Sequence, residues 1–470
     1  MMMRSLIRYD WKLLAADRTL SAVLLLLALL LGAAAWNGER FRTERAEAVE
    51  RVRDEVRTAD AADRAALVDT PPNPEEPWND PGNPYRRRAL AALSPGPLAD
   101  MAVGVSDVQP YWSQVGLFTL SFNVFRQYEI SNPLLLAVGG FDLAWAVAVL
   151  LPLLVITLSY DLVSAERERG TLALALSQGI SPGRYFGARL FARLFLASLL
   201  VAAGIVLARI ASGAPFGGDE TLAKLALWLA AALAYLAFWF AFAFFVQSLG
   251  LGSATNASIL LAAWIAATLL LPAGVSRLAA KRHPVPSRYA LLAEERRAES
   301  EAQRLQTELV ERFAHDHPEL LRADDVDRAD WIRRSYASRI DLERQLAPSH
   351  ATFREALAAQ QLLIDRYRFL SPTLLVHQAF LELSGSDMAR FRAFEAAVAG
   401  FAVEYRQQLV GPVFRNERLT AAGFDALPVF RLAEPDLTAN LRSVLPALLA
   451  LTGGAAALAL LGGARLRKLG

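Results

Sequence analysis

Residues 160–193 read YDLVSAERERGTLALALSQGISPGRYFGARLFAR and lie between two long apolar segments. Four charged residues stand together at 166–169, and Gly170 and Thr171 follow them directly. A Gly/Pro-rich turn and three arginines then lead into the next apolar segment. The pattern is typical of a compact loop that binds a soluble partner at a membrane surface. An ordinary polar loop with arginines on the inner side of the membrane has the same pattern.

The composition places the chain between soluble and fully membrane-embedded proteins. It has 470 residues, of which 54% are hydrophobic and 20% are charged, so we expect membrane spans joined to a sizeable water-exposed part. The net charge is only +2, which gives no basic excess for nucleic-acid binding. The absence of cysteine excludes disulfides, thiolate metal sites and cysteine nucleophiles.

Six apolar segments are long enough to cross a membrane, and they predict both chain ends on the cytoplasmic side. Arginine-rich residues 160–193 and both ends fall on one side, while a short acidic loop at 212–220 falls on the other, as the positive-inside rule requires. Residues 1–18 predict either an amphipathic helix on the inner membrane face or a simple basic flank. The predicted spans are 19–36, 134–159, 190–211, 222–246, 257–275 and 437–461.

Two polar insertions, 37–131 and 276–436, separate some of these spans. Mixed Glu/Arg patterns at helical spacing predict helices in both insertions, with breaks expected at prolines such as Pro348 and Pro412. Pro272 is similarly expected to break the fifth span. The predicted fold is therefore an all-α membrane protein with six transmembrane helices and a large helical extracytoplasmic domain built from both insertions.

Asp142 falls inside the second predicted span, where a carboxylate is costly unless it is paired or hydrated. Arg209 and Lys224 stand near the ends of neighbouring spans and are possible partners. Asp142 and Arg209 are therefore a possible intramembrane polar site in a pathway or gate. The alternative is that Asp142 lies close enough to the outer surface to be wet.

No enzyme motif is found in the sequence. There is no Walker A glycine loop, no G-x-S-x-G elbow and no H-E-x-x-H, so we expect no catalytic residue and no ATP site in this chain. One group resembles a ligand cluster, namely His315, Asp316 and His317 with Asp324, Asp325 and Asp327 downstream, but histidines two residues apart do not share a helix face. We interpret them as a solvated helix end and expect no metal site.

The E-R-E-R-G-T run at 166–171 follows an apolar segment and precedes a Ser/Pro turn, Arg184 and an aromatic-rich entry to the next segment. This order resembles the first cytoplasmic loop of ABC-2-type transporter permeases. The segments NPLLLAVGGFDLAWAVAVLLPLLVITLSYD (132–161) and FLSPTLLVHQAFLELSGSD (369–387) resemble the subgroup with large extracytoplasmic insertions. The resemblance covers most of the chain and is strongest over 132–193.

The resemblance implies a permease subunit, expected to be an exporter, in the bacterial inner membrane. The implied partners are a separate ABC ATPase that binds ATP and Mg, a second permease copy or paralogue, membrane lipid and a possible periplasmic partner, with no nucleic acid. In this family the loop contacts the ATPase, and Glu166 and Glu168 would meet its basic residues. The implied ATPase-coupling residues are Glu166, Arg167, Glu168, Arg169, Gly170, Thr171 and Arg184.

A second class of function fits the same sequence. The loop would relay ATPase motion to the extracytoplasmic domain, which would act on a periplasmic partner without a transport pore. A membrane enzyme is the third class, and the missing catalytic residues disfavour it.

Overall fold

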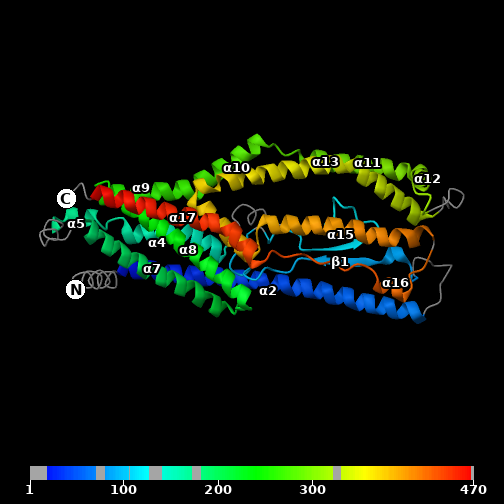
Figure 1. The fold of residues 1–470 in the computed structure, drawn as a ribbon, viewed down its shortest axis with the longest axis horizontal. Helices are drawn as coiled ribbons and strands as arrows, with labels where there is room; N and C mark the ends of the chain where they lie inside the picture. The colour runs from blue at the N-terminus through cyan, green and yellow to red at the C-terminus, as the bar shows by residue number, and fades with distance from the viewer. Residues whose placement is uncertain are drawn as a thin grey trace.

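The computed structural model is an elongated molecule with an apolar half and a polar half placed end to end (Figure 1). The long helix α2 (Arg18–Asp69, 52 residues) runs through both halves, a distance of about 78 Å at 1.5 Å per residue. The structure describes residues 18–69, 80–104, 106–125, 140–171, 182–320, 330–415 and 417–466. The predicted N-terminal segment 1–18 lies outside the described residues except for Arg18.

Among the residues that the structure describes, six helices are long and apolar enough to cross a membrane, which indicates a multi-pass membrane protein. Together they form the apolar half, at the left of Figure 1. The helices are α2, α4 (Leu143–Ser159) with the short α5 (Ser164–Glu168), α7 (Pro182–Ser212), α8 (Asp219–Gln247), α9 (Ser253–Ile265) with η3 (Ala266–Leu270) and α10 (Leu271–Arg282), and α17 (Leu437–Leu466).

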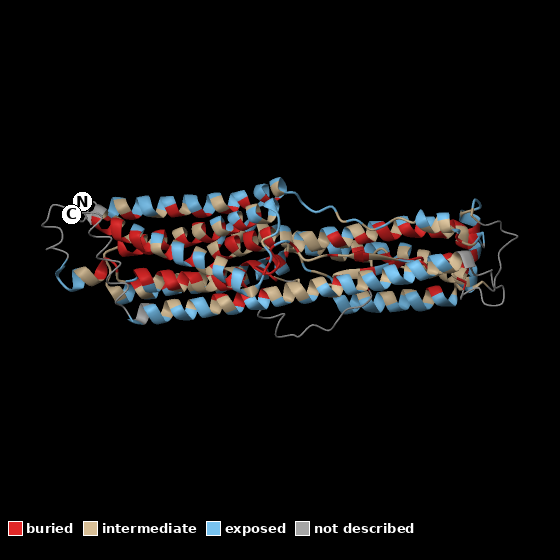
Figure 2. Cartoon of the chain, turned by 90° about the horizontal axis from the view of Figure 1, so that it is seen from below, coloured by how far each residue is buried: buried red, intermediate tan, exposed pale blue. Residues whose placement is uncertain are grey.

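The centre of the apolar half is α8, whose aromatic side chains fill the space between the other helices. Trp228, Tyr235, Trp239 and Phe240 are all buried. In the most apolar windows, 61% of α8 and of α4–α5 is buried, but only 17% of α9–α10 and of α17. The second group therefore leaves most of its apolar residues exposed, where lipid would cover them in a membrane. Figure 2 shows such exposed residues in pale blue along the outer helices and buried residues in red toward the centre of the molecule.

A short apolar helix, α14 (Pro372–Ser384), also packs in the apolar half, although it lies within the second polar insertion of the sequence. Phe380 stacks on Trp228 with ring centroids 3.9 Å apart. The Tyr235 hydroxyl donates to the Ala148 carbonyl at 2.8 Å and lies 3.0 Å from the Thr373 hydroxyl. These contacts tie the polar insertion to the centre of the helix bundle.

The expected break at Pro272 is wrong, because the helix continues past it to Arg282. The five residues before Leu271 widen into a π-helix, in which Leu271 N–H bonds to the Ala266 carbonyl. Pro272 has no N–H to offer the next carbonyl, that of Ala267. The hydroxyl of Ser371, at the start of α14, donates to that carbonyl at 2.6 Å and replaces the missing bond.

The polar half contains a helical frame and a small β-hairpin, so the expectation of an all-α fold is wrong in detail. Strands β1 (Arg88–Ala92) and β2 (Trp112–Gly116) pair antiparallel, with Arg88 opposite Gly116. The sequence of β1, RALAA, does not alternate apolar and polar residues and so does not predict a strand. The burial of such a short strand depends on the helices that it packs against. The remaining elements are η2 (Pro84–Arg86), α11 (Arg288–Arg304), α12 (Gln306–Asp316), α13 (Trp331–Tyr367), η5 (Arg368–Leu370), α15 (Met388–Phe414) and α16 (Ala421–Asp425).

A further expected break, at Pro348, is also wrong. Pro348 lies inside α13, and the helix continues through it to Tyr367. The 37-residue α13 is held by contacts with α10, α11, α12 and α15, so tertiary packing outweighs the local cost of proline in this helix. The break expected at Pro412 agrees with the structure within two residues, because α15 ends at Phe414.

Glu343 of α13 joins three parts of the polar half. Its Oε1 accepts from the Ser121 backbone N–H at 2.9 Å, and its Oε2 pairs with Arg406 Nη1 of α15 at 2.6 Å. Burial alone would raise the pKa of this carboxyl. The Ser121 hydrogen bonds and the Arg406 charge outweigh burial and lower the pKa below its ordinary value.

We expect the polar half to lose stability in acid partly through Glu343. Because its pKa is lower in the folded state, Glu343 stabilises the fold above the pKa of the unfolded chain, about 4.3, and this stabilisation is lost as pH falls through the folded value. Glu343→Gln should lower the free energy of unfolding at pH 7 by about 1–3 kcal/mol and flatten its dependence on pH below 5. Thermal unfolding of the full chain from pH 3 to 8 measures both effects. If the stability of Glu343→Gln falls below pH 5 as steeply as that of the wild type, Glu343 does not contribute to the acid sensitivity.

Candidate functional site

The segment that resembles a coupling loop lies at the end of the apolar half that is farther from the polar half. Figure 1 shows α5 there, at the same end as the beginnings of α2 and α7 and the end of α17. Its five residues, SAERE, form one turn of helix directly after α4. Most side chains of α5 contact other parts of the chain, and those contacts decide what the segment can do.

Glu166 faces α7, the helix that follows the loop. Its Oε1 accepts from the Tyr185 hydroxyl at 2.9 Å and pairs with Arg189 Nη1. The Arg189 side chain is 10% exposed and the Glu166 side chain 20% exposed, so the pair is shielded from solvent. Because a charged pair in such a place loses little strength to screening, Glu166 fixes α5 to α7.

Arg167 and Glu168 face the turn between α8 and α9. Arg167 Nη2 donates to the Leu251 carbonyl at 2.7 Å. Glu168 accepts from the Ser253 N–H at 2.7 Å and from its hydroxyl at 3.0 Å, at the first residue of α9. A carboxylate in this position satisfies a helix N-terminus and complements its dipole. Together the two side chains fix α5 to the start of α9.

Gln247, the last residue of α8, connects the same elements from within. Its Oε1 accepts from the Val163 N–H at 2.6 Å, and its Nε2 donates to the Ser159 carbonyl at the end of α4. Gln247 is buried, so its side chain takes the place of water as the hydrogen-bond partner of these backbone groups between α4 and α5. We call α5 with its contacts to Arg189, Gln247 and Ser253 the α5 clamp.

The predicted ATPase-coupling residues thus divide into two groups. Glu166 is shielded from solvent, whereas Arg167 and Glu168 are exposed and also bond to the turn between α8 and α9. That Glu166 and Glu168 meet a partner's basic residues stays a prediction. Arg169, Gly170 and Thr171 follow on the exposed surface, and Gly170 has φ +74°, a left-handed conformation that favours glycine. The side chain of Arg184 and residues 172–181 lie outside the described part of the structure.

Asp142 does not lie in the middle of a span, because α4 begins at Leu143 and Asp142 is its N-cap. The side chain is 1% exposed, so it is not wet. Its oxygens accept from the Trp145 N–H at 2.7 Å and the Val103 N–H at 2.8 Å. Asp142 therefore starts the helix and holds residues near Val103 of the first insertion against the apolar half.

Arg209 pairs with Asp100, and not with Asp142 as the sequence suggested. The two side chains are 0% and 2% exposed, and Arg209 Nη2 also donates to the Pro215 carbonyl at 2.7 Å. A Cβ on Gly38 of α2 would collide with the Asp100 carbonyl oxygen, so glycine is needed for this close approach. Lys224, the other suggested partner, pairs with Glu220 at 2.8 Å.

Sequence reasoning missed Gln247, Ser253 and Asp100. Gln247 and Ser253 flank a short glycine-containing turn, and the only sequence signal was a polar residue at each end of two apolar runs. Asp100 stands in a stretch of small residues with no recognisable motif. Their roles depend on partners that are distant in sequence, such as Arg209, which is 109 residues away from Asp100.

The histidine cluster gives no metal centre in the described residues. His315 lies 3.6 Å from Asp316 and its side chain is 91% exposed, while His317 ends α12 and stacks on Phe313. No group of three His, Cys, Asp or Glu side chains suited to a metal ion occurs among the residues that the structure describes. The aspartates at 324, 325 and 327 lie outside them.

Comparison with known proteins identifies one region. Residues 288–433, from the start of α11 to beyond α16, match the family described as a domain of unknown function, DUF3526. The match covers less than half of the chain and includes α14, which packs in the apolar half. No curated protein and no solved structure matches the chain.

Proposed function

We propose that this chain is the membrane-spanning permease subunit of an ABC-2-type transporter, expected to export its substrate and driven by a separate ATPase. The observation that carries the proposal is the α5 clamp. A short surface element between the second and third apolar helices is bonded to α7 through Arg189 and to α9 through Ser253. Force applied to its exposed residues would therefore reach three membrane helices directly.

In this arrangement Arg169, Gly170 and Thr171 form the contact surface for the ATPase, and the ATPase binds ATP and Mg. This end of the molecule and both chain ends would be cytoplasmic. The polar half would then be periplasmic, which fits an inner-membrane protein of the bacterial envelope.

The packed centre of the apolar half supports a dimer. Trp228, Tyr235 and Trp239 occupy the middle of the bundle, so a substrate path would run between two copies or paralogues and not through one chain. The outward apolar faces of α9–α10 and α17 are suitable for such an interface or for lipid.

The alternative function, force transmission to a periplasmic partner without a pore, is favoured by the continuity of α2. That helix passes from the apolar to the polar half without a break. Substrate efflux from proteoliposomes separates the two functions, because a force-transmitting subunit would stimulate the ATPase without releasing any enclosed solute.

The exposed position of Arg169 gives the first test. Wild-type protein in nanodiscs should recruit one of the organism's ABC ATPases and raise its ATPase rate, and Arg169→Glu should weaken recruitment at least tenfold, about 1.4 kcal/mol. Arg297→Glu, an exposed arginine on α11 in the polar half, is the control and should bind normally. The permease proposal is wrong if the wild type recruits no ABC ATPase, and the assigned surface is wrong if Arg169→Glu binds normally.

A further inference from the structure

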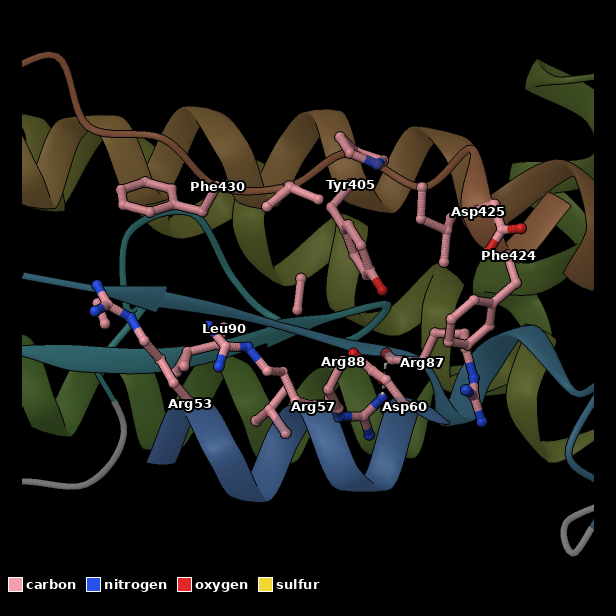
Figure 3. Close-up of a pocket in the computed structure, with 16 residues that line it drawn as sticks. Arg53, Arg57, Asp60, Arg87, Arg88, Leu90, Tyr405, Phe424, Asp425 and Phe430 are labelled. Atoms are coloured by element: carbon pink, nitrogen blue, oxygen red, sulfur yellow. Dashed lines mark hydrogen bonds between the residues drawn. The ribbon is translucent and has the colours of Figure 1, made fainter. Parts of the chain in front are cut away.

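A cavity of about 400 Å³ lies in the polar half between α2, β1 and the segment that follows α16 (Figure 3). Its size is within the range of small-molecule sites in proteins. It is separate from the α5 clamp, and no step of the proposed function uses it. Two kinds of side chain line it, arginines on the α2 and β1 side and apolar residues on the side of 427–430.

Four arginines reach the cavity: Arg53 and Arg57 from α2, and Arg87 and Arg88 from the start of β1. Arg87 is 3% exposed, and its guanidinium lies 5.1 Å from the centre of the Phe424 ring. One nitrogen pairs with Asp63, but its buried Nε has no hydrogen-bond partner in the described structure. A buried donor without a partner is costly.

Arg88 is held in place by the hairpin. Its Nη1 donates to the Tyr85 carbonyl at 2.6 Å, and its side chain crosses Gly116 on the opposite strand. A Cβ on Gly116 would lie 2.7 Å from Arg88 Cδ, so only glycine leaves room for this position. The bonds of Arg88 are to carbonyl groups, so its charge is not neutralised by them.

Arginines outnumber acids by four to two in the lining itself, and one of the two acids, Asp425, is bound by two nitrogens of Arg64 at 2.8 and 2.6 Å. Asp60 is the other. Three of the four arginines have an acidic partner beside the cavity, because Arg53 pairs with Glu50, Arg57 with Asp54 and Arg87 with Asp63. Arg88 is bonded to carbonyl groups, so an anion would find positive charge there and further N–H donors on Arg57.

The opposite wall is apolar and includes one hydroxyl. Leu427, Val429 and Phe430 come from the extended segment after α16, and Leu90 lies across from them. The Tyr405 hydroxyl extends toward the arginine side (Figure 3). Burial, followed by the nearby charge of Asp60, raises the pKa of Tyr405 to about 12, so the hydroxyl remains a hydrogen-bond donor at neutral pH.

We propose that this cavity binds an organic anion, a carboxylate or phosphate on an apolar body, with Arg57, Arg87, Arg88 and the Tyr405 hydroxyl around the anionic group and the 427–430 wall against the apolar body. Guanidinium groups suit both anions, because their paired N–H donors match carboxylate and phosphate oxygens. The anion would come from a soluble metabolite or from a lipid, and the two sources share this chemistry.

The test is calorimetric titration of the full chain in nanodiscs, with empty nanodiscs subtracted. Hexyl phosphate or hexanoate should bind, whereas hexanol, which lacks the charge, and hexyltrimethylammonium, which reverses it, should bind at least tenfold more weakly. Arg57→Gln/Arg88→Gln removes two exposed arginines and should weaken anion binding at least tenfold. Arg40→Gln/Arg51→Gln removes two exposed α2 arginines outside the cavity and should leave binding unchanged.

Gly116→Ala provides a second, independent variant, since it displaces Arg88 without removing a charge, and it should also weaken binding. Lysophosphatidic acid distinguishes the sources, because a lipid site would bind it at least tenfold more tightly than hexyl phosphate and a metabolite site would not. The proposal is overturned if neither anion nor lysophosphatidic acid binds, if hexanol binds as tightly as hexanoate, or if both the arginine double variant and Gly116→Ala bind like wild type.

Discussion

Asp100→Ala should lower the free energy of unfolding by about 3–5 kcal/mol, because it leaves the Arg209 guanidinium, which is 0% exposed, without its counter-charge. The pair also joins three elements. Asp100 lies against Gly38 of α2, and Arg209 of α7 holds the Pro215 carbonyl in the α7–α8 loop. Reversible unfolding of the full chain in mixed micelles measures the loss.

Asp425→Ala is the matched control for this prediction. It removes the same side chain from an ion pair with Arg64, but the two partners are 49% and 52% exposed, so the loss should stay below about 1 kcal/mol. Asp100→Leu/Arg209→Met replaces both charges by apolar groups and should recover much of the stability. If Asp100→Ala costs no more than Asp425→Ala, the pair does not hold these elements together.

The same pair shows what the sequence could and could not predict. The six apolar helices follow from the length and composition of local segments, which need no knowledge of distant partners. The charge of Arg209 was visible near the end of an apolar run, but its partner was chosen wrongly. Asp142 was chosen because it lies inside a predicted span, but its carboxylate caps the first turn of α4. The partner of Arg209 is Asp100, which lies in a loop without a recognisable sequence pattern.

Proline positions and the hairpin were difficult to predict for a related reason. Pro272 and Pro348 each predict a break locally, but partners elsewhere in the chain keep the helices continuous. Near Pro272 the Ser371 hydroxyl donates to the Ala267 carbonyl, which is 104 residues away from it in the sequence. Short strands such as β1 depend on the surface they cover, and a sequence of one arginine, three alanines and one leucine does not show that surface.

The candidate site was predicted as a segment but not as a set of contacts. The run 166–171 was singled out by its charge between two apolar segments, and the structure brings it together with α7 and α9. The sequence does not show which of its side chains face outward. The orientation of a five-residue helix is set by distant partners such as Gln247 and Ser253. Under the proposed function, the shielded position of Glu166 predicts that a variant at this residue separates binding of the ATPase from transmission of its motion.

Glu166→Ala should abolish stimulation of the ATPase while recruitment is retained. The change removes the bonds to Tyr185 and Arg189 and so detaches α5 from α7, but it leaves Arg169, Gly170 and Thr171 on the surface. We expect at least a tenfold fall in stimulated ATPase rate in nanodiscs, with ATPase recruitment within about twofold of wild type. Arg169→Glu should give the reverse order of effects, with recruitment lost first.

Glu166→Gln and Arg189→Met/Glu166→Leu distinguish a broken connection from a misfolded loop. Glutamine keeps an oxygen that accepts from the Tyr185 hydroxyl at the same place, so Glu166→Gln should retain more of the stimulation than Glu166→Ala. The double variant replaces the shielded pair by apolar contact and should restore thermal stability without restoring the hydrogen-bonded connection. Stimulation that follows thermal stability across the three variants would mean that the α5 clamp only maintains the fold. Stimulation that follows the hydrogen bonds would mean that it transmits force, since the variants then differ in connection and not in folding.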